Sequence, residues 1–182
     1  MEVDPFAARR AAKKGAMIEL ALSYAPELRA YIRRFAPTPW EADDLLQETM
    51  VRALTQLDGL RDSARCRAWL FRIARNVFLD QVKRRRPQPI GDDGAISKRC
   101  ASHTATPLRP DLERALGALP SKQRECLLLC DLWGFRYAEI ARIVGAPIGT
   151  VRSRISRGRA ELQLTLAAHA RGRVAPVKRG RR

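Results

Sequence analysis

The sequence lacks any long hydrophobic run. No segment approaches the roughly 18 consecutive apolar residues that are needed to span a membrane. The first 17 residues, MEVDPFAARRAAKKGAM, contain no apolar stretch of signal-peptide length. We therefore expect a cytoplasmic protein that is not inserted in a membrane and whose cysteines are reduced.

Cysteine is scarce, and none of the four cysteines belongs to a Cys-x-x-Cys pair. Cys126 and Cys130 are four residues apart in an apolar run, so both are expected to face the interior from one side of a helix. Cys100 and His103 lie close together in a polar stretch and could bind a metal ion. Because a second pair of ligands is missing, we expect no metal site and no cofactor.

Strand signals are almost absent, because no segment alternates steadily between apolar and polar residues and β-branched residues are sparse. Hydrophobic residues nevertheless make up 46% of the chain, which excludes wholesale disorder. They recur at helical spacing on both sides of a central segment. The sequence therefore predicts an all-α protein.

Acidic residues are outnumbered, with 19 Asp and Glu against 35 Lys and Arg, a net charge of +16. Such a balance makes an acidic polymer or an anionic membrane surface the first candidate partner. The last 14 residues alone carry 6 basic and no acidic side chains. A basic tail of this kind is usually a non-specific electrostatic handle. The informative charge is therefore the charge inside the predicted helices.

The segment 87–110 separates two helical parts of the chain. It contains four prolines and two glycines with no helical or strand period, which predicts a flexible linker between two small helical domains. Thr38 and Glu41 are spaced as a capping box at the start of one helix. The predicted helices cover residues 15–36, 40–57 and 67–86 before the linker, and 111–118, 121–132, 137–143 and 147–166 after it.

The segment 137–162, YAEIARIVGAPIGTVRSRISRGRAEL, has the pattern of a helix-turn-helix. Ala141 stands where the helices touch, Gly145 where the turn is left-handed, and Val151 where the second helix locks on the first. Arginine can bind guanine and Ser or Thr can hold phosphate. An ordinary helical hairpin with a solvated basic face is the alternative. The second helix projects Thr150, Arg152, Ser153, Ser156, Arg157 and Arg159.

The segment 67–86, RAWLFRIARNVFLDQVKRRR, combines a basic face with aromatic residues. Aromatic rings can stack on unpaired bases while Arg and Lys hold the backbone of the same strand. Trp69 and Phe78 have the spacing of core residues. Phe71 lies off that stripe and is the better stacking candidate, whereas Asn76 either reads a base edge or is solvated.

The segment 41–54, EADDLLQETMVRAL, predicts an amphipathic helix with an acidic outer face. Acidic side chains repel DNA, so this face either contacts another protein or is simply solvated. Its polar residues are Glu41, Asp43, Asp44, Gln47, Glu48 and Arg52.

These motifs together resemble the bacterial RNA polymerase sigma factors, most closely the extracytoplasmic-function (ECF) type of the sigma-70 family. The resemblance rests on four ordered segments, which are EADDLLQETMVRAL, RAWLFRIARNVFLDQVKRRR, LGALPSKQRECLLLCDLWGFRYAEIA and GAPIGTVRSRISRGRAEL. It implies an N-terminal extension (1–16), region 2 (17–86), a linker (87–110), region 4 (111–168) and a basic tail (169–182). The region 2 domain is implied to be a bundle of three to four helices and region 4 a four-helix domain.

The resemblance also implies roles for individual residues. The acidic helix matches the surface that binds the clamp helices of the polymerase β′ subunit, through Asp44, Leu45, Gln47, Glu48 and Arg52. The loop 58–66 and the basic helix match the part that recognises and melts the minus-ten element, through Leu60, Phe71, Arg72, Arg75, Asn76, Lys83 and Arg84. Leu60 stands where some relatives carry an aromatic residue. The last helix matches the reader of the minus-thirty-five element, through Thr150, Arg152, Ser153, Arg154, Ser156, Arg157 and Arg159.

The resemblance therefore implies a promoter-specificity subunit of core RNA polymerase that binds the β′ clamp helices, the β flap and promoter DNA. It also implies an anti-sigma factor, which in some systems holds the sigma factor at the inner membrane. The competing hypotheses are a stand-alone helix-turn-helix regulator and a nucleic-acid-modifying enzyme. The sequence shows no nucleophile–base set, phosphate loop or metal cluster, so we expect no catalysis by the chain itself.

Overall fold

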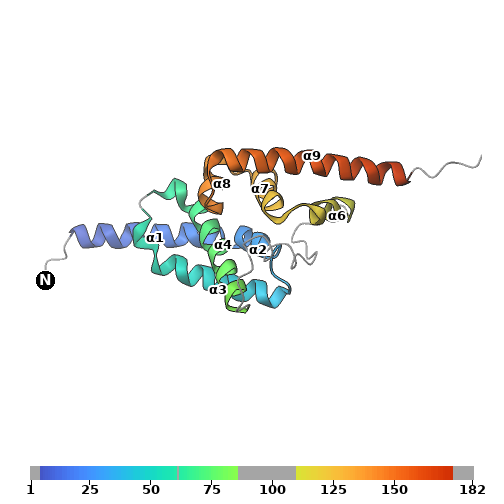
Figure 1. Ribbon diagram of the computed structural model, residues 1–182. Helices are drawn as coiled ribbons and strands as arrows, with labels where there is room; N and C mark the ends of the chain where they lie inside the picture. Colours follow the sequence, from blue (N-terminus) through green and yellow to red (C-terminus); the bar gives the residue numbers. More distant parts are fainter. Residues whose placement is uncertain (1–4, 61, 86–109, 174–182) are drawn as a thin grey trace, which may run out of the picture.

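The computed structural model describes residues 5–60, 62–85 and 110–173, and within these ranges every regular element is a helix. The first group of helices is α1 (Pro5–Ser23), α2 (Ala25–Ile32), α3 (Pro39–Thr55) and α4 (Cys66–Arg85), with short 3-10 turns η1 (Leu57–Gly59) and η2 (Ser63–Arg65) before α4. The second group is α6 (Pro110–Ala118), α7 (Ser121–Asp131), α8 (Tyr137–Val144) and α9 (Ile148–Arg173) (Figure 1). We call these groups the N-terminal unit and the C-terminal unit.

The expected helix over 15–36 is wrong, because the structure divides this stretch into α1 and α2. The break falls at Tyr24, two residues before Pro26. Proline has no N–H to continue the hydrogen-bond ladder, and its ring collides with the carbonyl of the preceding turn. α1 also begins at Pro5, inside the expected N-terminal extension, and α9 runs to Arg173, inside the expected tail.

The start of α3 follows the predicted cap in part. Thr38 has extended backbone angles, and its hydroxyl accepts a hydrogen bond from the Glu41 N–H at 3.2 Å. The Glu41 carboxylate accepts a hydrogen bond from Arg85 at 2.7 Å, which ties the start of α3 to the end of α4. Thr38 therefore caps α3, while Glu41 joins two helices.

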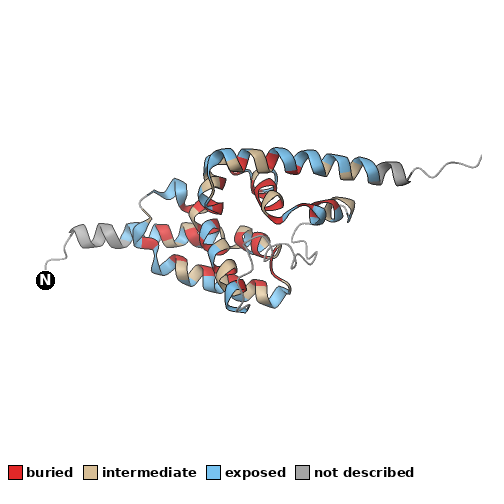
Figure 2. Ribbon diagram, in the orientation of Figure 1, coloured by how far each residue is buried: buried red, intermediate tan, exposed pale blue. Residues whose placement is uncertain are grey.

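The N-terminal unit buries the inner faces of its helices around α4. α3 and α2 both pack on α4. Leu28 and Ile32 of α2, Leu45 of α3 and Leu70 of α4 are buried there, and such residues line the inward sides of the ribbon (red in Figure 2). Burying apolar area in this way stabilises the bundle by about 25 cal/mol per Å².

The C-terminal unit is built around the contact between α7 and α9. Leu129, Ile140, Val151 and Ile155 are all buried in its core. α8 ends at Gly145, whose φ of 65° and ψ of 43° are left-handed, as the turn of a helix-turn-helix requires. The predicted helix-turn-helix is therefore present as α8 and α9.

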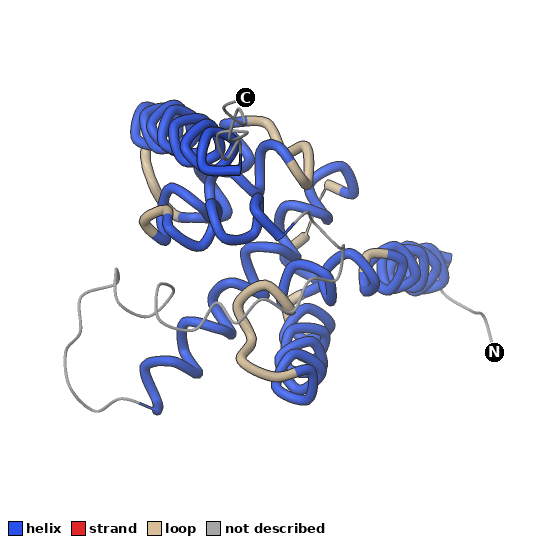
Figure 3. The backbone as a smooth tube through the Cα atoms, turned by 90° about the vertical axis from the view of Figure 1, so that its right-hand side faces the viewer, coloured by secondary structure: helices blue, strands red, loops and turns tan. Residues whose placement is uncertain are grey.

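The two units share one hydrophobic core, because α4 packs against α8. In Figures 1 and 3 the C-terminal helices lie on one side of the N-terminal bundle. The sequence predicted the all-α class correctly but gave no sign of this contact. The expected linker 87–110 lies outside the described residues apart from Pro110, which begins α6. Across the described ranges, no helix is both long enough and apolar enough to cross a membrane.

Candidate functional site

The outer face of α3 carries part of the acidic set that the sequence singled out. Asp44, Gln47 and Glu48 are exposed along this helix. Leu45 is only 2% exposed and belongs to the core, so it does not lie on the predicted docking surface. A leucine one residue after Asp44 points about 100° away around a helix, which explains its burial.

Arg52 lies at the edge of this face and is held by two carboxylates. It donates to Glu48 at 2.7 Å and to Asp80 of α4 at 2.7 Å. These hydrogen bonds, which Arg52 donates to Asp80 and Glu48, raise the pKa of Arg52. Arg52 therefore fastens α3 to α4 as well as lying beside the predicted docking surface.

Sequence reasoning missed the exposed apolar residues on the same face. Trp40 is 82% exposed and Val51 is 58% exposed. Together with Asp44 and Gln47 they follow the i, i+4, i+7, i+11 spacing of a single helix face. This spacing was the signal that could have identified them. We call Trp40, Asp44, Gln47, Glu48 and Val51 the α3 face; large exposed apolar side chains rimmed by polar ones are typical of protein-binding surfaces.

The solvent side of α4 carries a basic stripe. Arg72, Asn76 and Lys83 are exposed and lie on one face at i, i+4 and i+11, and Arg84 is exposed beside them. Leu60, in the loop before α4, is half-buried against the core. Trp69 is half-buried and Phe78 is buried, so their predicted assignment to the core is confirmed.

Phe71 and Arg75 lie on a different face of α4, the face covered by the C-terminal unit. Phe71 is fully buried at 0% exposure. Its ring centroid lies 4.8 Å from that of Tyr31, 4.8 Å from that of Phe135 and 6.1 Å from that of Trp133. Phe71 lies off the main stripe of α4 because it packs on the other unit, and it is not accessible to a base in this arrangement.

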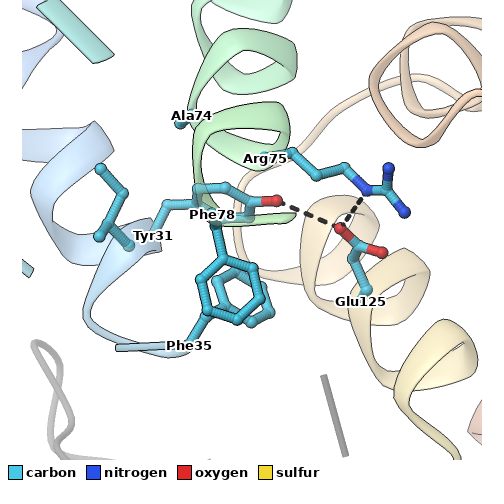
Figure 4. A pocket seen from close by; sticks show the side chains of 7 residues that line it. Tyr31, Phe35, Ala74, Arg75, Phe78 and Glu125 are labelled. Atoms are coloured by element: carbon cyan, nitrogen blue, oxygen red, sulfur yellow. Dashed lines mark hydrogen bonds and ion pairs between the residues drawn. The ribbon is translucent and has the colours of Figure 1, made fainter. Parts of the chain in front are cut away.

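Arg75 is engaged by a carboxylate of the C-terminal unit. Its Nε donates to Oε1 of Glu125 at 2.8 Å, and the two side chains are 11% and 2% exposed (Figure 4). The Tyr31 hydroxyl donates to the same Glu125 oxygen at 3.3 Å. Burial, followed by the charge of Glu125, holds the pKa of Tyr31 well above its usual value, so the phenol is neutral.

The second helix of the helix-turn-helix, α9, presents a basic surface at its N-terminal half. Arg152, Ser156 and Arg157 are exposed, whereas Thr150, Ser153 and Arg154 are half-buried. The Ser153 hydroxyl donates to the Thr150 carbonyl at 3.0 Å. Of the residues predicted to contact DNA from α9, Arg152, Ser156 and Arg157 are therefore the ones that face solvent.

Arg159 is exposed but tied to α7. Its guanidinium donates to the carboxylate of Asp131 at 3.2 Å from Nε and 2.5 Å from Nη2. The hydrogen bond to Asp131 raises the pKa of Arg159. The predicted phosphate contact of Arg159 thus requires this ion pair to be shared or exchanged.

The cysteines of α7 face inward as predicted. Cys126 is fully buried, and burial raises the pKa of its thiol to about 11. Cys130 is half-buried, and burial raises its pKa as well. Cys100 and His103 lie outside the described residues. Among the residues that the structure describes, no three His, Cys, Asp or Glu side chains are grouped so that they could hold a metal ion.

Two family models match the chain, one over each unit. The sigma-70 region 2 model matches residues 20–88, and the model of sigma-70 region 4 matches residues 109–162. The fold and these matches define the class as sigma-70-type proteins, each region falling on one unit.

The sequence is similar to individual curated sigma factors. It is 36% identical over 148 residues to the ECF RNA polymerase sigma factor EcfG of Rhodopseudomonas palustris, covering 80% of this chain and 82% of that one. It is 33% identical over 162 residues to the ECF RNA polymerase sigma factor SigC of Mycobacterium tuberculosis, covering 79% and 88%.

The structure is similar to that of the sigma factor RpoE from Bartonella quintana, solved with the anti-sigma factor NepR. The TM-score is 0.62 at 33% identity, covering 80% of this chain and 93% of that one. CnrH, solved with the cytosolic domain of CnrY, gives 0.60 at 29% identity, covering 88% and 95%. The chain belongs to the ECF RNA polymerase sigma factors. It therefore directs transcription initiation at promoters and is neither an enzyme nor a stand-alone regulator.

Proposed function

We propose that different surfaces of the two units divide the work of promoter recognition. The α3 face binds the β′ clamp helices of core polymerase, and the C-terminal unit meets the β flap. The loop 58–66 and α4 recognise and melt the minus-ten element, and α9 reads the minus-thirty-five element. Residues 17–86 and 111–168 act as regions 2 and 4, joined by the linker 87–110.

The segregation of charge between helices is the observation that carries this proposal. Asp44 and Glu48 are exposed on α3, whereas Arg72 lies on the solvent side of α4 and Arg152 and Arg157 lie on α9. A DNA phosphate backbone is attracted to the basic helices and repelled by α3. The α3 face is thus free to meet a protein while the basic faces meet DNA.

Two DNA contacts on one chain suit the energetics of promoter opening. Unstacking a base step costs a few kcal/mol, which is offset when the extruded base enters a pocket and is stacked there. Holding the duplex upstream through α9 raises the effective concentration of the melted strand near α4. The tethered arrangement therefore supports opening without any catalytic group on the chain.

An anti-sigma factor is the regulatory partner that we propose. The similar RpoE of Bartonella quintana was solved with the anti-sigma factor NepR, which supports such a partner here. The chain then acts in the cytoplasm, or is held at the inner membrane where its anti-sigma factor is membrane-bound.

Reconstituted transcription tests the proposal. Core polymerase with the full chain should start transcription at discrete sites on a genomic template, and the chain alone should bind promoter DNA weakly. Asp44→Arg should weaken core binding by at least about tenfold, or ~1.4 kcal/mol, because it places a cation on the α3 face. Glu19→Arg, which reverses an exposed charge on α1, is the matched control.

The readouts separate docking from promoter recognition. Core binding is measured by fluorescence anisotropy of the labelled chain, and initiation by mapping transcript starts. Equal core affinity for the two variants would remove α3 from the docking surface. Absence of initiation at every site of the template would overturn the proposed function.

A further inference from the structure

The face of α4 that carries Phe71 and Arg75 is covered by the C-terminal unit, although both residues belong to the proposed minus-ten surface. We propose that this contact is an autoinhibitory latch. In it Glu125 takes the place of a DNA phosphate at Arg75, and Trp133 and Phe135 cover Phe71. The latch rests on the proposed function, because it closes the surface assigned to melted DNA.

The pairing of Arg75 with Glu125 prevents the same donor of Arg75 from binding DNA. A guanidinium presents planar donors that suit a carboxylate and a phosphate equally well. The Arg75 Nε that reaches Glu125 Oε1 at 2.8 Å is therefore engaged when the units are together. The same donor becomes available to a DNA backbone only when α7 leaves α4. Glu125 is an intramolecular competitor for the group that DNA needs.

Because the ion pair of Arg75 and Glu125 is buried, the stability of the contact between the units depends on both side chains. Glu125 is 2% exposed, so its carboxylate relies on Arg75 and on the Tyr31 hydroxyl for compensation. Removing one partner of a buried ion pair is strongly destabilising, because the remaining charge stays desolvated. When the units separate, by contrast, both charges regain water. The contact is therefore sensitive to a change of a single group.

The turn between α7 and α8 supplies the aromatic cover. Gly134 has a φ of 66° and lies between Trp133 and Phe135, and this left-handed residue lets both flanking rings face the N-terminal unit. The Trp133 ring lies 5.3 Å from Tyr31, and the Phe135 ring lies 4.8 Å from Phe71, centroid to centroid. The ring proposed to stack on a base is thus packed edge-on against two aromatic rings of the C-terminal unit.

Arg67 of the N-terminal unit contacts the turn between α7 and α8. Its Nε donates to Glu27 of α2 at 2.9 Å, within the same unit. Its Nη2 also donates to the Trp133 carbonyl at 2.6 Å, and its guanidinium carbon lies 4.1 Å from the centroid of Phe135. Glu27 holds Arg67 independently of the C-terminal unit. Arg67 therefore stays in position to bind the turn between α7 and α8 when the units separate.

Packing at the latch is incomplete. A cavity of about 10 Å³, room for roughly one water-sized sphere, lies between Tyr31, Phe35, Phe78, Arg75 and Glu125 (Figure 4). Side chains that border a void forgo contacts that a filled core would make. The contact between the units is therefore not completely filled at this point.

Hydrogen–deuterium exchange and DNA binding on the full chain test the latch together. The Glu125→Gln variant keeps the shape of the side chain but removes the charge that compensates Arg75. Backbone exchange should become faster over residues 66–78 and 125–136. The affinity for a labelled, mixed-sequence single-stranded DNA should rise roughly tenfold, because apparent affinity scales with the open fraction. Glu19→Gln removes an exposed charge elsewhere and should match the wild type in both measurements.

Tyr31→Phe provides the second variant. It removes only the hydroxyl that donates to Glu125 and keeps the ring, so a smaller rise in exchange and affinity is expected. If Glu125→Gln loses its cooperative thermal transition, Tyr31→Phe decides the matter. Exchange and affinity equal to the wild type would then overturn the latch.

The remaining outcomes are equally decisive. Faster exchange in Glu125→Gln without tighter DNA binding would show that the contact does not compete with DNA, and would overturn the proposal. Unchanged exchange in a folded Glu125→Gln chain would do the same. The latch and the proposed function can also fail separately. If Glu125→Gln shows faster exchange and tighter DNA binding, but the wild type with core polymerase starts no transcription, the latch is supported and the proposed function is overturned.

Discussion

Replacing Gly145 tests how the turn of the helix-turn-helix holds α9. Gly145 ends α8 with a φ of 65° and a ψ of 43°, and its N–H donates to the Ala141 carbonyl. A Cβ built at this position meets nothing within 4 Å. The cost of a side chain therefore comes from the backbone conformation alone and not from a collision.

The size of the effect follows from that geometry. An ordinary L-residue pays about 1–2 kcal/mol in the left-handed region. Alanine also restricts the unfolded chain, which returns about 0.4–1 kcal/mol. We expect a loss of about 1 kcal/mol in the free energy of unfolding for Gly145→Ala, more for Gly145→Val, and less for Gly145→Asn, because asparagine tolerates this region.

Urea unfolding followed by far-ultraviolet circular dichroism measures these losses. Gly158→Ala is the matched control, since Gly158 lies inside α9 and its added Cβ makes only ordinary contacts, 3.6 Å from that of Gln123. It should gain about 0.5–1 kcal/mol from helix propensity. Equal losses for Asn and Val at position 145, or a gain for Ala, would refute the assignment of the cost to a left-handed backbone.

Two further predictions concern single buried residues. Leu45→Ala should lose about 2–5 kcal/mol of unfolding free energy because the Leu45 side chain is only 2% exposed. Val51→Ala is the control and should lose less than about 0.5 kcal/mol, because Val51 is 58% exposed. Coincident urea unfolding curves for the two variants would place Leu45 at the surface instead. The folded chain holds Cys126 as a neutral thiol with its pKa raised from 9.0 to about 11. As pH rises through that window the unfolded state ionises first, so stability present below pH 9 should fall by at most about 3 kcal/mol, and Cys126→Ala should flatten this part of the pH profile. An unchanged profile in Cys126→Ala would assign the alkaline loss to other groups.

Local signals in the sequence predicted the helices and their faces well. Thr38 marks the start of α3 because a hydroxyl at that position satisfies an N–H of the first turn. Gly145 marks the turn because glycine alone occupies the left-handed region at no steric cost. One exception is Pro26, where helical periodicity continued through a residue that interrupts the hydrogen bonding, so that α1 and α2 were predicted as a single helix; the outer ends of α1 and α9 also extend beyond the predicted bounds.

Contacts between distant residues were beyond the reach of these signals. Periodicity indicates which face of α4 is apolar, but it does not name the partner of that face. Arg75 and Glu125 are 50 residues apart, and Tyr31 and Glu125 are 94 apart. The basic character of Arg75 indicates an anionic partner, and the sequence pattern predicted that this partner is the DNA backbone. A glutamate meets the same requirement, and nothing in the local sequence indicates that Glu125 lies beside Arg75.

The sequence separation of the latch residues has a consequence for biosynthesis. At 5–20 residues per second, the ribosome needs roughly 3–10 s to add the 50 residues between Arg75 and Glu125. Throughout that interval the nascent N-terminal unit has neither Glu125 nor Trp133 to cover Phe71. Each newly made molecule thus passes through a stage in which the C-terminal unit does not yet exist to cover Phe71 and Arg75, so the latch can close only after synthesis has passed Trp133.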